Sequence, residues 1–125
     1  MNTEYPDCAK IAEAIAAFPI ETAQNGSLVE RIPYGNGHIN DTFLLRCETT
    51  GNIETKFILQ RMNHSIFKNP PQLMENIVHV TQYLRKIILS QGGNPDRETL
   101  NVLQTRDGAD WFLDSSQNYW RVFPF

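Results

Sequence analysis

The chain has 125 residues, which is long enough for one compact domain with its own hydrophobic core. Hydrophobic residues make up 41% of it and the formal net charge is −3, so the composition argues against a broad nucleic-acid or membrane-binding surface. The first residues lack the basic start and apolar run of a signal peptide, and no apolar stretch approaches the roughly 20 residues that span a bilayer. Two widely separated cysteines, Cys8 and Cys47, favour reduced thiols, and we expect a cytoplasmic protein.

The N-terminal half changes from a helical pattern to strand-like patterns. Residues 7–18 carry apolar side chains at helical spacing and are followed by Pro19, so we expect a helix that ends there. Strand-like segments follow at residues 28–34, 42–47 and 56–62. A glycine-containing loop separates the first two of these segments, which favours a β-hairpin.

The C-terminal half is dominated by a helical pattern over Pro70–Ser90. Two prolines suit its first turn and two glycines follow its end. Its apolar stripe consists of Leu73, Ile77, Val80, Leu84, Ile87 and Ile88. We expect a loop at residues 94–96 and then two or three strands, with candidates at residues 100–105, 110–113 and 118–123. This order of elements predicts an α+β fold, in which a five-stranded antiparallel sheet carries one long packed helix.

The loop between the first two strands has the residues of a phosphate-binding loop. It consists of Gly35, Asn36, Gly37, His38, Ile39 and Asn40. Glycines let the backbone approach an anion closely and point N–H groups at it. A strand-loop-strand context is typical of the kinase phosphate loop, although Asn40 replaces the third glycine of that pattern. Considered alone, the loop is explained better as a plain hairpin turn than as a phosphate-binding loop.

Four segments, taken together in their order and spacing, resemble the aminoglycoside phosphotransferase family. They are residues 35–43, residues 57–63, residues 66–70 with 73–77, and residues 119–125. The nearest likeness is to the branch of N-acetylhexosamine 1-kinases, which phosphorylate the anomeric hydroxyl of an amino sugar with ATP and magnesium. The resemblance covers nearly all of the chain after Leu28.

The resemblance implies that residues 28–125 form a protein-kinase-like N-lobe, preceded by a helix and turn in residues 1–27. ATP would lie under the loop at residues 35–40, and the backbone from Phe123 to Phe125 would form the hinge that meets adenine. The Asp that accepts the substrate proton and the Asp that holds magnesium would lie in a C-terminal lobe beyond this chain.

An N-lobe without its second lobe would be inactive alone and would bind no cofactor tightly. We also expect it to self-associate, through residues 118–125 or the sheet face that the second lobe would cover, because uncovered apolar surface recruits a partner.

A kinase orients a basic residue of the third strand with a carboxylate from the following helix. Arg61 is the basic candidate, but a shift of one residue would turn its neighbour Gln60 inward instead. Glu75 is the acidic candidate on the helix. A helical wheel places Glu75 opposite the apolar stripe and Asn76 beside it, so both remain candidates for the nucleotide-facing position.

Two other classes of function fit the sequence less well. A non-catalytic interaction domain with a kinase N-lobe fold is the main alternative, and it would bind no nucleotide. Some relatives of such sequences carry the label of mucin desulfatase. A sulfatase needs a Cys or Ser in a Cys/Ser-x-Pro-x-Arg context, and neither Cys8 nor Cys47 fits. His64 and His79 have no companions at metal-ligand spacing, so we expect no metal site in the chain.

Overall fold

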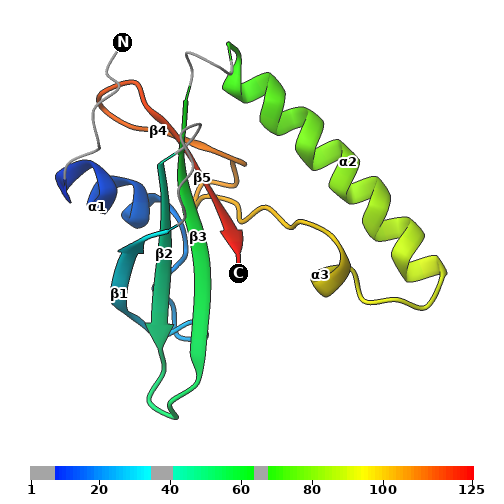
Figure 1. Ribbon diagram of the computed structural model, residues 1–125, viewed down its shortest axis with the longest axis horizontal. Coiled ribbons are helices and arrows are strands. Elements are labelled where there is room, and N and C mark those ends of the chain that lie inside the picture. The colour runs from blue at the N-terminus through cyan, green and yellow to red at the C-terminus, as the bar shows by residue number, and fades with distance from the viewer. Residues whose placement is uncertain (1–7, 35–40, 64–67) are drawn as a thin grey trace.

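The computed structural model describes residues 8–34, 41–63 and 68–125. These residues form, in chain order, α1 (Cys8–Ala17), β1 (Ser27–Pro33), β2 (Asp41–Glu48), β3 (Glu54–Met62), α2 (Pro70–Ser90), α3 (Pro95–Glu98), β4 (Phe112–Leu113) and β5 (Tyr119–Pro124). The strands make one five-stranded antiparallel sheet in the order β1-β2-β3-β5-β4 (Figure 1). The predicted α+β fold and antiparallel sheet are therefore confirmed.

One face of the sheet is the core of the protein. Side chains alternate along a strand, and most residues of β2, β3 and β5 that point to this face are buried. They pack against the apolar side of α1 and the turn that follows it. The cluster consists of Ile11, Ala14, Ile15, Phe18, Ile20, Phe43, Leu45, Cys47, Phe57, Leu59, Trp120 and Val122. We call this side of the sheet the α1 face.

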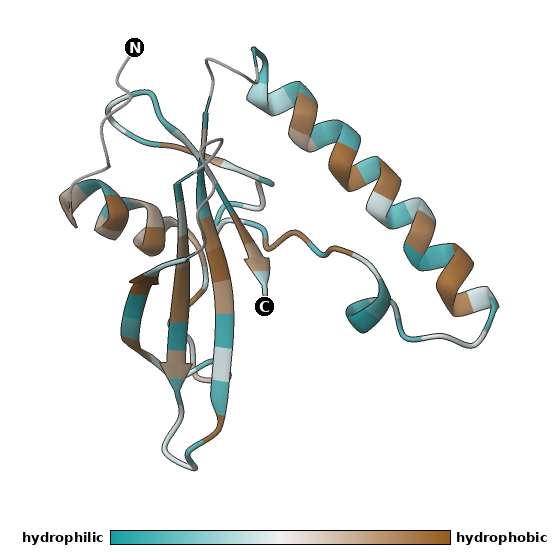
Figure 2. Ribbon diagram, viewed as in Figure 1, coloured by the Kyte–Doolittle hydropathy of each residue, from teal (hydrophilic) through white to brown (hydrophobic). Residues whose placement is uncertain are grey.

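The opposite side of the sheet, the α2 face, is only partly covered. The N-terminal turns of α2 reach it, and the buried residues of that helix are Pro70 and Met74. Apolar residues recur along the rest of α2 (Figure 2), but many of them are exposed. The most exposed are Val80, Tyr83, Leu84 and Leu89. The expectation of one long packed helix is thus met at its first turns and not along its length.

Local sequence explains the bounds of α2, and polar contacts explain its position. The side chain of Asn69 caps the first turn by accepting a hydrogen bond from the backbone of Gln72 at 3.2 Å. Near the other end, the Arg85 guanidinium donates to Asp96 at 3.0 Å and also to Asn101. These contacts tie α2 to the segment around α3. A hollow of about 660 Å³ separates the middle of the helix from the segment at residues 101–105.

Two expectations for the segment between α2 and β4 were wrong. The predicted loop at residues 94–96 contains the start of α3, because the Asn94 side chain accepts from the backbone N–H of Asp96 at 3.0 Å and caps a short turn. The predicted strand at residues 100–105 forms a single bridge, between Leu103 and Val122. The contacts of the Asn101 side chain with Arg85 and with the backbone of Thr99 hold the start of this segment away from the sheet.

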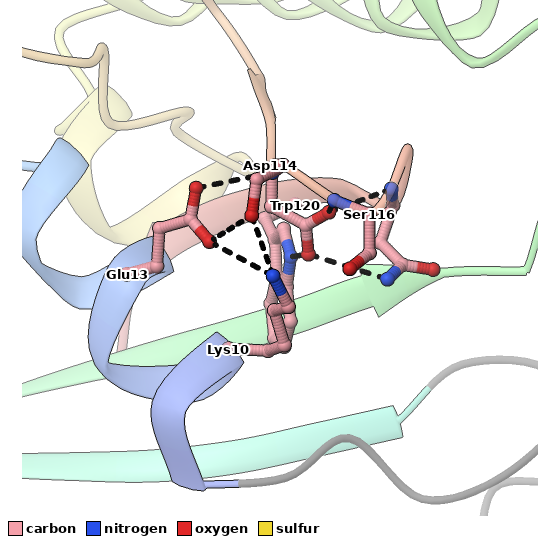
Figure 3. A network of polar contacts seen from close by, with 7 residues as sticks. Lys10, Glu13, Asp114, Ser116 and Trp120 are labelled. Atoms are coloured by element: carbon pink, nitrogen blue, oxygen red, sulfur yellow. Dashed lines mark hydrogen bonds and ion pairs between the residues drawn. The ribbon is translucent and has the colours of Figure 1, made fainter.

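A buried carboxylate organises the turn before β5. Asp114 accepts four hydrogen bonds, two on each oxygen (Figure 3). Oδ1 accepts from the backbone of Ser116 at 2.7 Å and of Asn118 at 2.9 Å, and Oδ2 accepts from the Asn118 amide at 3.2 Å and from Trp120 Nε1 at 2.9 Å. Burial alone would raise the pKa of Asp114, but these hydrogen bonds outweigh it and lower the pKa below its ordinary value.

The same turn is fastened to α1. The carboxylate of Glu13 accepts from the backbone of Ser115 at 3.1 Å and from its hydroxyl at 3.0 Å, and Lys10 donates to that hydroxyl as well (Figure 3). The turn therefore connects the first helix of the fold to its last strand.

Replacing Asp114 with Asn should destabilise the fold, because the amide NH₂ of the new side chain would face two donors. We expect a loss of about 2 kcal/mol at pH 7. Since the folded-state pKa of Asp114 is lowered, its contribution is present at neutral pH and is lost as the pH falls below about 4. In thermal melts from pH 7 to pH 3, the difference in melting temperature between wild type and D114N should therefore become smaller as the pH falls. The exposed Asp107 offers a matched control, and D107N should match wild type throughout; a D114N curve that does the same would contradict this assignment.

Candidate functional site

Two neighbouring rows of side chains cross the α2 face of the sheet. Register places Thr42 opposite Gln60 and Gln60 opposite Arg121, which makes a polar row across β2, β3 and β5. A second row, made of the paired residues two positions away on each strand, is apolar. It consists of Leu44, Ile58 and Phe123. Residues two apart on a strand share a face, so the two rows lie side by side.

Hydrogen bonds connect the polar row from end to end. Gln60 Nε2 donates to Thr42 Oγ1 at 3.2 Å, and Gln60 Oε1 accepts from Arg121 Nε at 3.0 Å. The terminal nitrogen Nη1 of Arg121 lies 3.8 Å from the sulfur of Met74, which is fully buried. The amide of Gln60 therefore fixes the guanidinium from one side, and the helix contacts it from another.

Arg121 is a cation in a largely apolar setting. Its guanidinium lies 5.0 Å from the centre of the Phe123 ring, and burial lowers the pKa of Arg121 from its ordinary value. An arginine nevertheless remains protonated at neutral pH. Among the described residues, no carboxylate pairs with Arg121, whereas Arg46 on β2 and Arg61 on β3 each have an acidic partner.

The structure places Gln60 and Arg61 on opposite faces of the sheet. Arg61 lies on the α1 face, where its side chain is 8% exposed. It pairs there with Asp41, which is opposite it on β2, at 2.5 Å from Nη2 and 2.8 Å from Nε. Gln60, rather than Arg61, is thus the residue of the third strand that faces α2.

Neither candidate on α2 reaches the sheet. Glu75 and Asn76 are both exposed, and Asn76 accepts a hydrogen bond from Gln72 one turn earlier at 3.2 Å. Within the part of the chain that the structure describes, Glu75 forms no ion pair. The position next to the sheet is occupied by Met74, which is fully buried.

The last residues lie beside the start of β3 and the end of β1. Phe123 is buried in the apolar row, while Phe125 is 62% exposed. The backbone N–H of Phe125 donates to the carbonyl of Lys56 at 3.0 Å, and its ring meets the edge of Tyr34 at 5.8 Å between centres. Tyr34 directly precedes the glycine-containing loop. The candidates in that loop, residues 35–40, lie outside the described residues.

Sequence reasoning missed Arg121 and Met74. The signal for Arg121 was present, because a single arginine stands in the apolar strand at residues 119–123 and shares its face with Phe123. No comparable signal marks Met74, which reads as an ordinary apolar residue of a helix.

The bridging amide of Gln60 can be tested by its effect on stability. Gln60→Leu keeps the size of the side chain but leaves Arg121 Nε without its acceptor, so we expect a loss of about 1–2 kcal/mol in the free energy of unfolding. Gln104→Leu is the matched control, because Gln104 is exposed and its side chain donates a hydrogen bond to Asp110 at 3.3 Å. Urea unfolding of both variants would measure the difference, and equal effects would show that the polar row adds nothing to stability.

Comparison with known proteins leaves the family open, since no protein-family model matches the chain. Among residues 8–34, 41–63 and 68–125, no helix is long and apolar enough to cross a membrane, and no group of three or more His, Cys, Asp or Glu is placed to hold a metal ion.

Proposed function

We propose that this chain is the ATP-holding N-lobe of a small-molecule kinase whose acceptor is an amino sugar of the N-acetylhexosamine class. The observation that carries the proposal is the pair of rows on the α2 face, one apolar and one polar with a cation. A nucleotide has the same two parts, a flat base and a charged phosphate chain. The likeness of four sequence segments to N-acetylhexosamine 1-kinases points to the acceptor.

The apolar row suits the base. Leu44 and Ile58 are partly buried and lie next to each other on β2 and β3, so together they offer a flat apolar surface. The C-terminal segment from Phe123 to Phe125 runs beside that surface on β5 and past the start of β3. Backbone groups of such a segment can recognise the edge of adenine, as the hinge of a kinase does.

The polar row suits the phosphates. Phosphoryl transfer depends mainly on positioning and on cations that neutralise the transferred group. Arg121 supplies such a cation on the face that α2 approaches, and the neutral amide of Gln60 orients it. Magnesium would neutralise further charge, and the described residues hold no acidic cluster for it. The proposal therefore assigns the magnesium ligands and the catalytic Asp to a second lobe.

Binding and turnover test different parts of this proposal. The 125-residue chain should bind ATP weakly, in the millimolar range, because the second lobe contributes half of the site. It should transfer no phosphate to N-acetylhexosamines, whereas a polypeptide in which the chain continues into a catalytic lobe should do so. Titration with ATP and a coupled ADP-release assay on both proteins would measure this.

Two results would reject the proposed function. An isolated chain that fails to bind ATP would show that the two rows serve no nucleotide, and would favour the non-catalytic interaction domain. Turnover by the 125-residue chain itself would show that the second lobe is dispensable and that the assigned roles are wrong.

The isolated N-lobe should also associate with itself through its C-terminal segment. Phe125 is 62% exposed and its ring contacts that of Tyr34, which is 45% exposed, so the two rings form one exposed apolar patch of the kind that favours association. Sedimentation velocity at high micromolar concentration should show dimers, and Phe125→Ser should weaken them about tenfold. Ile53 is 65% exposed in the turn between β2 and β3, so Ile53→Ser is the matched control and should leave association unchanged. A wild-type chain that stays monomeric under these conditions would contradict this expectation.

A further inference from the structure

We propose that Arg121 binds the phosphate groups of the nucleotide, taking the role that kinases give to a basic residue of the third strand. This inference rests on the proposed function and names the residue that would read the charged part of the ligand. Next to Arg121 the third strand offers the neutral Gln60, because Arg61 lies on the α1 face in a pair with Asp41. The basic residue that β3 does place on the α2 face, Lys56, lies near the start of the strand and pairs with Glu54 at 3.2 Å. The cation has its place one strand further, on β5.

The contacts of Arg121 leave it able to bind an anion. A guanidinium has five N–H donors, and the described contacts use one at Nε for Gln60 and one at Nη1 for the weak acceptor sulfur of Met74. The other donors suit the paired oxygens of a phosphate, which arginine binds in a two-pronged manner. No side-chain nitrogen or oxygen among the described residues is both fully buried and without a partner, so these donors are either bonded or open to solvent.

The charge of Arg121 is also unbalanced locally. Arg46, on the same face of the sheet, is surrounded by the carboxylates of Glu30, Glu48 and Glu54. Arg121 has no acidic partner among the described residues, and it lies between the apolar side chains of Met74 and Phe123. Electrostatic attraction is stronger where water is partly excluded, so a bound anion would interact more strongly with Arg121 than with an exposed arginine.

Gln60 and Met74 place the guanidinium before any ligand arrives. The hydrogen bond from Nε to Gln60 fixes the plane of the group, and Gln60 is itself held by Thr42. A side chain that is already ordered loses less entropy on binding. Because Arg121 lies next to the apolar row, it sets the orientation of the ligand, with the base on Leu44 and Ile58 and the phosphates on Arg121.

The test compares ATP with adenosine, because only ATP carries phosphates. The full 125-residue chain would be titrated with each ligand and followed by NMR, including the Nε–H signal of Arg121. Arg121→Met should weaken ATP binding about tenfold or more and leave adenosine binding within about twofold. Arg121→Lys keeps the charge without the fork geometry and should weaken ATP binding by a smaller factor. Arg46→Met removes one positive charge from the same face and should change neither affinity by more than about twofold.

The outcomes separate this inference from the proposed function. If the wild-type chain binds no ATP, both are overturned. If the wild type binds ATP and Arg121→Met binds it equally well, the inference alone is overturned, and Arg61→Met shows whether Arg61 holds the phosphates instead. If Arg121→Met weakens ATP and adenosine alike, Arg121 has a packing role and the inference is wrong. Should Arg121→Met fail to fold, Arg121→Lys decides by the same ATP-to-adenosine comparison.

Discussion

The antiparallel register between β3 and β5 determines which side chains lie on each face of the sheet. Trp120 fixes that register, since its side chain is fully buried on the α1 face while its indole N–H donates to Asp114 at 2.9 Å. With Trp120 in the core, Arg121 must point to the other face, where it meets Gln60. A slip of one residue would place Arg121 in the core and expose Trp120. The carboxylate of Asp114 therefore helps to position a cation that it does not contact.

The position of α2 follows from a competition between apolar and polar contacts. Its apolar stripe would gain free energy by lying flat on the sheet. The helix instead contacts the sheet through Met74 near its start and is tied through Arg85 to Asp96 and Asn101 near its end. The contacts of Arg85 are partly exposed and therefore contribute little to stability. The helix leaves apolar surface exposed, and another protein surface can cover it.

How much the sequence could predict depends on the range of the interactions involved. The bounds of α2 depend on local signals, the prolines of its first turn and the glycines after its end, and they were predicted correctly as Pro70–Ser90. The strand alternation of β2 and β3 is also local. α3 depends on the cap formed by Asn94, which resembles an ordinary loop residue in a sequence. The distance of α2 from the sheet depends on contacts between residues far apart in the chain, which periodicity does not report.

Contacts between residues far apart in the chain also decide which candidate residues lie in the site. The sequence identified the right stretch of β3 but left Gln60 and Arg61 as alternatives, because a strand pattern fixes the alternation and not which set faces the helix. Only the pairing with Asp41 and the packing around Leu59 and Trp120 assign Arg61 to the α1 face. On α2, the helical wheel favoured Asn76 and the carboxylate of the kinase pattern favoured Glu75, but the residue that contacts the sheet is Met74.

A neutral residue on β3 and a cation on β5 make a coherent arrangement. An arginine at position 60 would face Arg121 directly across the strands, and two like charges at that spacing destabilise a sheet. Gln60 avoids this repulsion and uses its carbonyl to hold the guanidinium, while its amide group bonds Thr42. The cation therefore gains a fixed orientation from a neighbour that adds no charge of its own. Because Met74 lies against the same guanidinium, any shift of the first turns of α2 would change the environment of Arg121. The polar row and the helix are thus coupled through one side chain.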